Sequence, residues 1–417
     1  MKTATWLALI PGAGQYYNRR FIKGSVMLGL AAAFVITFAQ FLNIGYWGLF
    51  TLGTLQGTDD SRSLLIQGIL SVFLTLTALG FYAASIFDAR RDAQKIRDGW
   101  KIPPVRKALY DWFDAAFPYL LVTPGLILLI FVVVFPLLFM VLLAFTNYNR
   151  YNAPPGNLLD WVGFQNFFEI VNVPIWRETF ISVFSWTLTW TFGATTLQIA
   201  LALLLAVIVN DKRIKFKRLI RTVFILPWAV PGFVTIMIFS ALFNDNFGAI
   251  NRDIIVPLFG SGIPWLTDPF WAKTAIIMIQ VWLGFPFVYA LFTGVLQSIS
   301  SEWYEAADVD GGSKFQKFWY ITLPHILFAT APLLIMQYSF NFNNFNIIYL
   351  FNEGGPAVRG QEAGGTDILI SWVYSLTFEN SMYSLAAVVS IIMGLMVAIF
   401  AFFQFRRSRA FKEEGQI

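Results

Sequence analysis

Several kinds of residue are rare in this sequence or missing from it. Among 417 residues there is no cysteine, and His325 is the one histidine. The lack of cysteine excludes disulfides, thiolate metal sites and cysteine nucleophiles. A single histidine leaves little scope for histidine-based metal or acid–base chemistry. Charged residues make up only 13% of the chain, which lies well outside the range of soluble globular proteins.

What the sequence has in quantity is long apolar runs. Hydrophobic residues make up 57% of the chain, and its mean hydropathy is +0.63. Each run reaches the roughly 20 residues that a helix needs to cross a bilayer. The sequence therefore predicts an all-α integral membrane protein with eight transmembrane helices. We expect them at about 24–44, 64–87, 118–145, 179–209, 222–243, 272–297, 323–351 and 382–405.

Lys and Arg residues are divided unevenly between the two sides of these spans. Segments on one side hold 23 of the 29, and segments on the other side hold six. Because basic residues gather on the cytoplasmic side of a membrane protein, both termini and the segment 300–324 are expected in the cytoplasm. The same rule accounts for the net charge of +5 without a nucleic-acid partner. The six on the other side are Arg62, Arg150, Arg177, Arg252, Lys273 and Arg359.

The chain is expected to have two parts. Residues 1–115 contain two spans and then a charged cytoplasmic stretch, 88–115, which includes Pro103 and Pro104 and is predicted to be a linker. Residues 116–417 contain the other six spans and every polar motif of interest. The loops on the outer side are too short for an independent domain.

The spans themselves lack charge. No Asp, Glu, Lys or Arg lies in the interior of a predicted span, whereas transporters driven by protons or sodium generally need buried ionisable groups. A charged solute would have no partner there, so the cargo is expected to be neutral. The phosphate-binding motif GxxxxGK[ST] is also missing, so the energy for transport must come from a partner.

A polar helix–turn–helix segment separates the sixth and seventh spans. A first helix is expected to have Ser300 or Ser301 as its N-cap and to end at Gly311, since glycine tolerates the left-handed conformation. A second helix is expected from about Lys314. The alternative is an ordinary amphipathic loop on the membrane surface. The segment fits the pattern EAA, three residues, G, nine residues, I-x-L-P at Glu305, Ala306, Ala307, Gly311, Ile321, Leu323 and Pro324.

This pattern resembles the cytoplasmic coupling loop of ABC importer permeases. Further likeness in Asn341–Phe345, Gly354–Pro356 and Thr366–Asp367 is typical of the carbohydrate branch of that family, which handles maltose and maltodextrin. The resemblance runs from about residue 118 to the C-terminus. It implies a six-helix type I ABC importer permease core of the MetI-like fold, with its EAA coupling loop at 300–324. The residues that it implies for ATPase coupling are Glu305, Ala306, Ala307, Gly311, Leu323 and Pro324.

The resemblance also implies partners. These are a second homologous permease subunit, two copies of a cytoplasmic ABC ATPase that binds ATP and Mg, an extracellular sugar-binding protein, a neutral oligosaccharide and membrane lipid. No cofactor is expected in this chain. Enteric relatives insert a large domain between the third and fourth spans, but the loop 146–178 is short here. A bacterial cell membrane without an outer membrane around it is therefore expected.

Amides and aromatic residues interrupt the apolar runs of spans five to seven. Gln337, Asn341 and Asn344 are spaced to share one helical face, whereas Asn343 and Asn346 are expected to point elsewhere. Amides can bind sugar hydroxyls and aromatic rings can face a pyranose, but amides also hold membrane helices together. The predicted substrate path consists of Trp228, Gly232, Gln280, Trp282, Leu283, Gly284, Phe287, Gln337, Asn341 and Asn344.

The resemblance supports part of this path. Asn341, Asn344 and the three residues 282–284 match the family's substrate-site positions. Maltose-handling members tend to have Tyr, Ser, Asn and Tyr at positions 228, 232, 280 and 287, so the departures here are consistent with a longer or different oligosaccharide. Pro227, Pro231 and Pro286 can kink their helices, either as hinges or as the ordinary prolines of membrane helices.

The sequence thus favours a permease subunit of an ATP-driven importer for neutral sugars, in particular malto-oligosaccharides, that works by alternating access. Two alternatives stay open at this point. One is an ABC permease for another uncharged solute, and the other is an ion-coupled sugar symporter.

Overall fold

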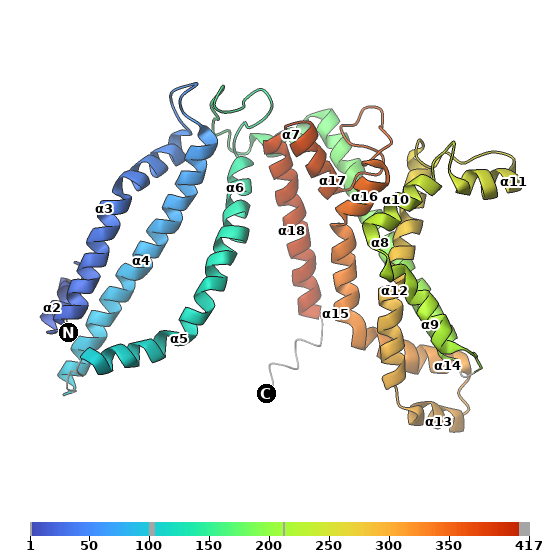
Figure 1. The fold of residues 1–417 in the computed structure, drawn as a ribbon, viewed down its shortest axis with the longest axis horizontal. Coiled ribbons are helices and arrows are strands. Elements are labelled where there is room, and N and C mark those ends of the chain that lie inside the picture. The colour runs from blue at the N-terminus through green and yellow to red at the C-terminus, as the bar shows by residue number, and fades with distance from the viewer. Residues whose placement is uncertain (1, 100–104, 212, 408–417) are drawn as a thin grey trace. The chain divides into compact units, whose positions relative to one another are not determined.

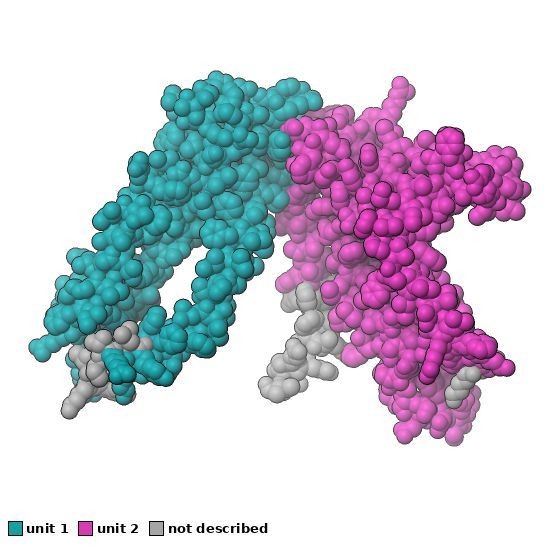
Figure 2. Space-filling model, in the orientation of Figure 1, with its two compact units in different colours: residues 1–166, 382–387 teal, residues 167–381, 388–417 magenta. Residues whose placement is uncertain are grey.

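The computed structural model describes residues 2–99, 105–211 and 213–407. In this part of the chain the regular elements are helices, and β structure is limited to two isolated bridges. Among the described residues, seven helices are long and apolar enough to cross a membrane, and one bent pair raises the number to eight. The predicted all-α membrane fold is therefore confirmed. The chain forms two compact units, shown in different colours in Figure 2: the residues up to 166 with 382–387, and 167–381 with the chain from 388 onward.

The first unit is built on a close helix pair, α3 (Phe21–Thr51) and α4 (Ser61–Arg97), which run side by side (Figure 1). Glycine permits the close approach, because a Cβ on Gly45 would lie 2.0 Å from the Ser71 hydroxyl oxygen. In lipid, where helices gain nothing from burying apolar surface, such contacts between small residues drive their association.

Two short helices, α1 (Lys2–Leu7) and α2 (Ala13–Tyr17), pack against one end of this pair. The Gln15 amide nitrogen donates to the Ser85 carbonyl oxygen at 2.8 Å. The Asn18 amide nitrogen donates to the Ala89 carbonyl oxygen at 2.7 Å. Gln15 and Asn18 are both buried, so these bonds fasten the N-terminal residues to α4.

The stretch predicted as a linker is largely helical. Its first ten residues continue α4 to Arg97, and there Asp88 and Asp92 form ion pairs with Lys23 of α3. Some charged residues of this stretch therefore hold α3 and α4 together. Pro103 and Pro104 lie outside the described residues.

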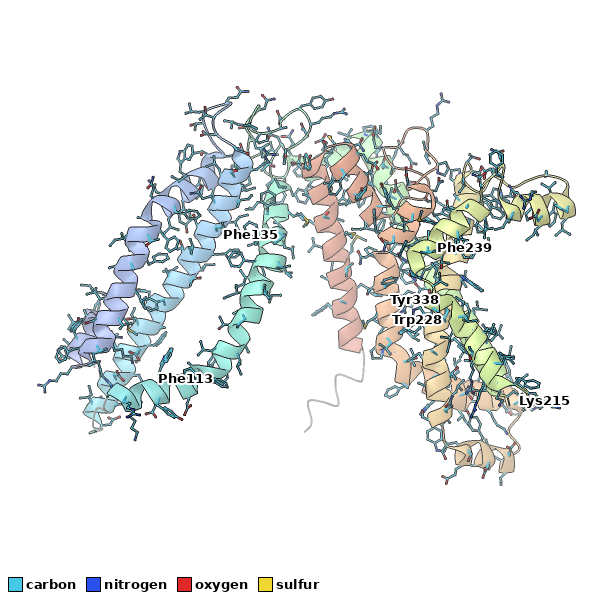
Figure 3. All side chains as sticks on the ribbon, in the orientation of Figure 1. Phe113, Phe135, Lys215, Trp228, Phe239 and Tyr338 are labelled. Carbon is cyan, nitrogen blue, oxygen red and sulfur yellow. The ribbon has the colours of Figure 1, made fainter. Side chains whose placement is uncertain are left out.

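The third span combines α5 (Val105–Leu129), a π-helical turn η1 (Ile130–Val134) and α6 (Phe135–Leu143). The ring of Phe135, labelled in Figure 3, lies 6.5 Å from that of Phe73 on α4. This span belongs to the first compact unit. The sequence analysis places the start of the six-helix permease core at residue 116, and this boundary stays a prediction.

In the second unit three long helices pack against one another: α8 (Pro174–Asn210), α12 (Pro269–Ser298) and α15 (Leu323–Phe342). Two groups of buried apolar residues hold them. The first apolar cluster contains Trp186, Trp190, Ala194, Ile236, Phe243, Trp265, Ala275, Ile276, Ile279, Ile347, Ile348, Phe351 and Ile368. The second apolar cluster contains Ala202, Ala206, Phe285, Val288, Tyr289, Phe292, Ile326 and Leu334.

Span five is broken rather than continuous. It was predicted as one helix over 222–243, but α9 (Lys217–Ile225) with the 3-10 turn η2 (Leu226–Ala229) meets α10 (Gly232–Leu242) at 89°. Pro227 and Pro231 explain the break, because each lacks an N–H and clashes with a continuing helix. Pro286, by contrast, lies inside α12 without interrupting it.

The remaining helices are shorter, apart from α18, and connect or flank these elements. They are α7 (Gln165–Asn172), η3 (Ile250–Ile255), α11 (Val256–Phe259), α13 (Ser301–Val309), α14 (Lys314–Lys317), η4 (Phe318–Thr322), α16 (Phe345–Asn352), α17 (Leu369–Tyr374), η5 (Ser375–Glu379) and α18 (Tyr383–Arg407).

The loop between α16 and α17 folds around a buried carboxyl group, outside the candidate spans. Asp367 accepts hydrogen bonds from the Gly364 amide at 2.8 Å and the Ser371 hydroxyl at 2.6 Å. Burial raises the pKa of Asp367 from 3.8 to about 6, although both hydrogen bonds lower it. The folded state therefore holds a proton on this carboxyl more tightly than the unfolded state does.

Asp367→Asn is expected to stabilise the protein more at neutral than at acidic pH. The stability linked to this carboxyl is fully present below about pH 3.8 and is lost as the pH rises through about 6. The loss reaches roughly 3 kcal/mol, since one pKa unit corresponds to about 1.4 kcal/mol. Thermal unfolding in detergent at about pH 4.5 and 7.5 measures it. An equal Tm difference between variant and wild type at both pH values would contradict this role.

Candidate functional site

A pocket of about 440 Å³ lies at the break in span five, where η2 and α10 face α12 and the end of α15. Irregular backbone at membrane depth is tolerated where it lines a cavity. The structure gathers eight of the ten predicted substrate-path residues around this pocket: Trp228, Gly232, Gln280, Leu283, Gly284, Phe287, Gln337 and Asn344. Its other lining residues were not predicted; they are Pro227, Val230, Pro231, Phe233, Ile236, Phe340, Asn346 and Ile347.

Aromatic rings form one wall of the pocket. Trp228 of η2, labelled in Figure 3, packs edge-on against Phe287 of α12, with ring centroids 5.8 Å apart. Trp228 is 59% exposed, so part of its indole stays open. Such rings offer a flat apolar face and, for tryptophan, a donor at the edge.

A chain of hydrogen-bonded amides forms another part of the site. The Asn344 nitrogen donates to the Gln280 oxygen at 3.0 Å, and the Gln280 nitrogen donates to the Gln198 oxygen at 3.3 Å. The Gln198 nitrogen then donates to the Gln337 oxygen at 3.2 Å. We call these four residues the amide chain. It joins α8, α12, α15 and Asn344, the N-cap residue of α16 (Phe345–Asn352).

Gln198 was missed by the sequence analysis. It is fully buried and lies behind the residues that line the pocket. The sequence did contain an indication of its role. Gln198 is an amide inside an apolar span, where an unpaired amide is costly, and the same argument identified Gln337. Unlike the residues 337, 341 and 344, however, Gln198 has no second amide at helical spacing on its own span to draw attention to it.

The amide chain crosses the second unit between its two apolar clusters. On α8, Gln198 falls between Ala194 of the first cluster and Ala202 of the second, and on α12, Gln280 falls between Ile279 and Phe285. An amide left unpaired in such surroundings costs about 1–3 kcal/mol, whereas an interhelical hydrogen bond in a membrane contributes only about 0.6 kcal/mol on average. Avoiding an unpaired amide is therefore the larger effect.

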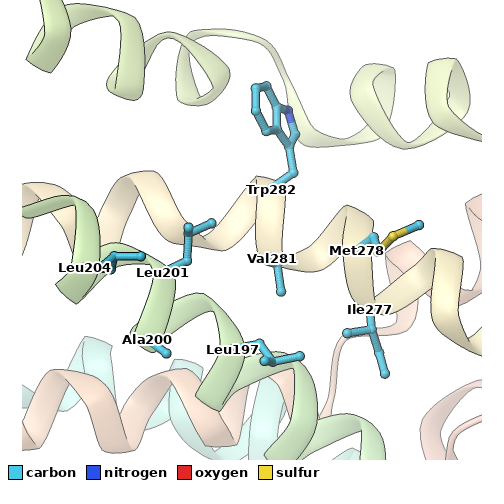
Figure 4. A pocket seen from close by; sticks show the side chains of 8 residues that line it. All are labelled: Leu197, Ala200, Leu201, Leu204, Ile277, Met278, Val281 and Trp282. Carbon is cyan, nitrogen blue, oxygen red and sulfur yellow. The ribbon is translucent and has the colours of Figure 1, made fainter.

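Two predicted residues lie elsewhere. Asn341 is fully buried, and its side-chain amide nitrogen donates to the Thr195 hydroxyl of α8 at 2.8 Å, while its backbone carbonyl oxygen accepts from the Trp190 indole at 2.8 Å. It therefore packs α15 against α8. Trp282 projects from α12 at a separate apolar groove, on the side away from Leu197 (Figure 4).

The expectation that Asn346 points away from the site was wrong, because Asn346 lines the pocket. The reason is that α15 ends at Phe342, and α16 starts afresh at Phe345 with Asn344 as its N-cap residue. The face predicted from continuous helical spacing therefore does not extend past the break. Asn343 is exposed and lies outside the pocket lining.

The segment 300–324 forms a second candidate site. The Ser300 side chain, rather than that of Ser301, caps α13 by accepting from the Glu302 amide at 3.3 Å. Gly311 has a φ of +75°, which is the left-handed turn expected there. Ser313 and Gln316 then form a capping box at the start of α14.

This segment is fastened to the start of α15. The Tyr304 hydroxyl hydrogen-bonds to that of Thr322 at 2.9 Å, and Lys317 forms an ion pair with Asp308. Of the predicted coupling residues, Glu305, Ala306, Gly311 and Pro324 are exposed, and Ala307 and Leu323 are half-buried. Val309 is 89% exposed and Phe315 is 71% exposed. The otherwise polar segment 300–324 therefore has apolar side chains on its surface.

Comparison with known proteins shows the family of this chain. The family described as "Binding-protein-dependent transport system inner membrane component" matches residues 198–410. The chain belongs to this family. As an inner membrane component of this kind, it is a permease subunit, which decides against the ion-coupled symporter.

Relatives support the same membership over almost the whole chain. The galactooligosaccharides transport system permease protein GanP of Bacillus subtilis is 50% identical over 99% of each chain. The maltodextrin transport system permease protein MdxF of Bacillus subtilis is 47% identical over 99% of this chain and 97% of its own. The resemblance to carbohydrate importer permeases is thereby confirmed.

A solved structure supports the inner membrane component fold. This is a bacterial ABC transporter involved in the import of the acidic polysaccharide alginate, which matches with a TM-score of 0.60 and 21% identity. The match covers 73% of this chain and 99% of that one. At this identity the likeness shows the fold alone, and it confirms the predicted ABC importer permease fold.

Gly284→Ala is expected to lower the stability of the protein, because the new Cβ would lie 1.9 Å from the Gln198 amide oxygen. Moving Gln198 would leave buried amides unpaired, at about 1–3 kcal/mol. Gly294→Ala on the same helix is the control, since its Cβ would meet nothing within 4 Å. Thermal unfolding in detergent should show a lower Tm for the first variant only. Equal Tm values for the two variants would mean that Gln198 moves freely.

Proposed function

We propose that this chain is the permease subunit through which an ATP-driven importer moves neutral oligosaccharides by alternating access. The observation that carries the proposal is the composition of the pocket. Its lining combines three amides from the amide chain with exposed aromatic surface, and it contains no charged side chain among the described residues. Amides bind hydroxyl groups, rings cover the apolar faces of pyranoses, and an ionic cargo would find no counter-charge.

The names of the relatives support a carbohydrate cargo. GanP is described by its transport of galactooligosaccharides and MdxF by its transport of maltodextrin. Both are uncharged hexose chains, and identity to the two proteins is nearly equal. The proposal is therefore made for neutral hexose oligosaccharides as a class, with malto-oligosaccharides as the first substrate to test.

Energy is proposed to enter through the segment 300–324, which docks on a cytoplasmic ABC ATPase that is present in two copies and binds ATP and Mg. The exposed Val309 and Phe315 favour a protein partner over water, since apolar side chains are stabilised when covered. The Tyr304 hydroxyl of α13 bonds to Thr322, the N-cap residue of α15, so a partner that moves α13 would also move the helix that carries Gln337.

The remaining partners complete an importer. We propose a second homologous permease subunit, an extracellular sugar-binding protein, and a bacterial cell membrane in which both termini of this chain are cytoplasmic. The uneven division of Lys and Arg supports that orientation. The short loop 146–178 supports an organism without an outer membrane.

Gly311→Asp is expected to abolish copurification with the ATPase while membrane insertion stays normal. The substitution puts a charge and a strained φ into the docking turn. Gly360→Asp is the matched control, because Gly360 has a similar φ of +80° and equally open surroundings, but lies between different spans. Copurification of both variants with the ATPase would contradict docking at 300–324. Glu305→Lys should behave like Gly311→Asp.

Asn344→Leu is expected to reduce uptake of a neutral oligosaccharide about ten-fold or more. The substitution removes a hydrogen bond to the substrate, and losing about 1.4 kcal/mol of stabilisation slows transport by a factor of ten. Asn343→Leu is the control, because this neighbour is exposed and outside the pocket. Uptake of labelled malto-, galacto- and acidic oligosaccharides by vesicles with equal permease content is the measurement. Normal uptake by Asn344→Leu would assign the amide to packing, and uptake of acidic sugars would reject a neutral cargo.

A further inference from the structure

The centre of the amide chain has no contact with the pocket itself. Gln198 is fully buried, it accepts a hydrogen bond from Gln280, and it donates one to Gln337. Both of these neighbours line the pocket, and Gln198 does not. The backbone of α12 leaves space for it only because residue 284 has no Cβ.

The amide chain has a direction. Each interior amide accepts through its oxygen from one neighbour and donates through its nitrogen to the next. Rotating one amide by 180° would place two donors or two acceptors against each other. That arrangement costs more free energy in apolar surroundings than in water. The orientation of every member is therefore set jointly, and Gln198 is the link between the α12 side and the α15 side.

The direction leaves two unlike ends at the pocket. Among the described residues, the Gln337 amide nitrogen and the Asn344 amide oxygen have no hydrogen-bond partner, and both residues line the pocket. One end is a donor and the other is an acceptor. A hydroxyl group can satisfy either, so the two ends suit a ligand with several hydroxyls held in one orientation.

We propose that Gln198 is a positioning residue for the oligosaccharide. It holds the Gln337 amide with its nitrogen toward the pocket and, through Gln280, the Asn344 amide with its oxygen toward the pocket. Substrate recognition by these two amides then depends on a side chain that the substrate does not touch. This inference rests on the proposed function, since it assigns a role in binding the proposed cargo.

The test uses the complete importer, with both permeases, the ATPase and the binding protein, reconstituted in liposomes. Gln198→Met keeps the length of the side chain and removes both hydrogen bonds. We expect sugar import per ATP hydrolysed to fall at least ten-fold, while ATP hydrolysis stimulated by the binding protein stays within about two-fold. A purely structural defect would lower both rates together, and that result would overturn the proposal, as would unchanged import.

Gln67→Met is the control variant. Gln67 also donates a hydrogen bond between two helices, to the Phe41 carbonyl oxygen at 3.1 Å, but it lies in the first compact unit. Its import per ATP should equal that of wild type. An equal loss in Gln67→Met and Gln198→Met would overturn the proposal, because any lost interhelical amide would then have the same effect.

A double-mutant cycle tests whether Gln198 acts through Gln337. In a Gln337→Met background, Gln198→Met should lower import per ATP by less than about two-fold, since coupled residues are not additive. Independent, multiplying losses would overturn the proposal. If Gln198→Met does not assemble, Gly284→Ala displaces the same side chain, and normal import by that variant would overturn it. A wild-type importer that hydrolyses ATP but imports no neutral oligosaccharide would overturn the proposed function together with this inference.

Discussion

A buried amide must find a partner, and this requirement governs the second unit. Hydrocarbon-like surroundings offer no water to an unpaired amide, so Gln198, Gln280 and Gln337 have to meet one another. They come from α8, α12 and α15, and the apolar clusters on either side allow many small adjustments of these helices. The hydrogen bonds allow few. The polar layer therefore fixes the helix arrangement that the apolar layers stabilise.

The same requirement applies to the backbone at the break in span five. Pro227 and Pro231 prevent a continuous ladder of hydrogen bonds, and the groups freed there cannot face lipid. Their position beside the pocket gives them access to water or to a ligand. The break and the pocket thus depend on each other: the pocket makes the irregular backbone tolerable, and the irregular backbone makes room for the pocket.

The sequence predicted what depends on local chemistry. The spans followed from apolar length, the turn at Gly311 from its tolerance of positive φ, and half of the pocket lining from the amides and aromatic residues in the apolar runs together with the family resemblance. The rest depends on tertiary packing. Whether Pro231 kinks or breaks a helix is decided by its neighbours. The placement of Asn346 required the end of α15, which no strong signal marks, and Gln198 required its partners on two other helices.

Because α13 is attached to the start of α15, a movement of α13 would tilt α15. Gln337 lies 14 residues after Leu323, or about 21 Å along the axis, so a tilt of about 10° at the foot displaces it by roughly 3–4 Å. That exceeds the range of a hydrogen bond. A tilt of that size would therefore break the Gln198–Gln337 hydrogen bond, so the orientation of the Gln337 amide depends on how the segment 300–324 is held.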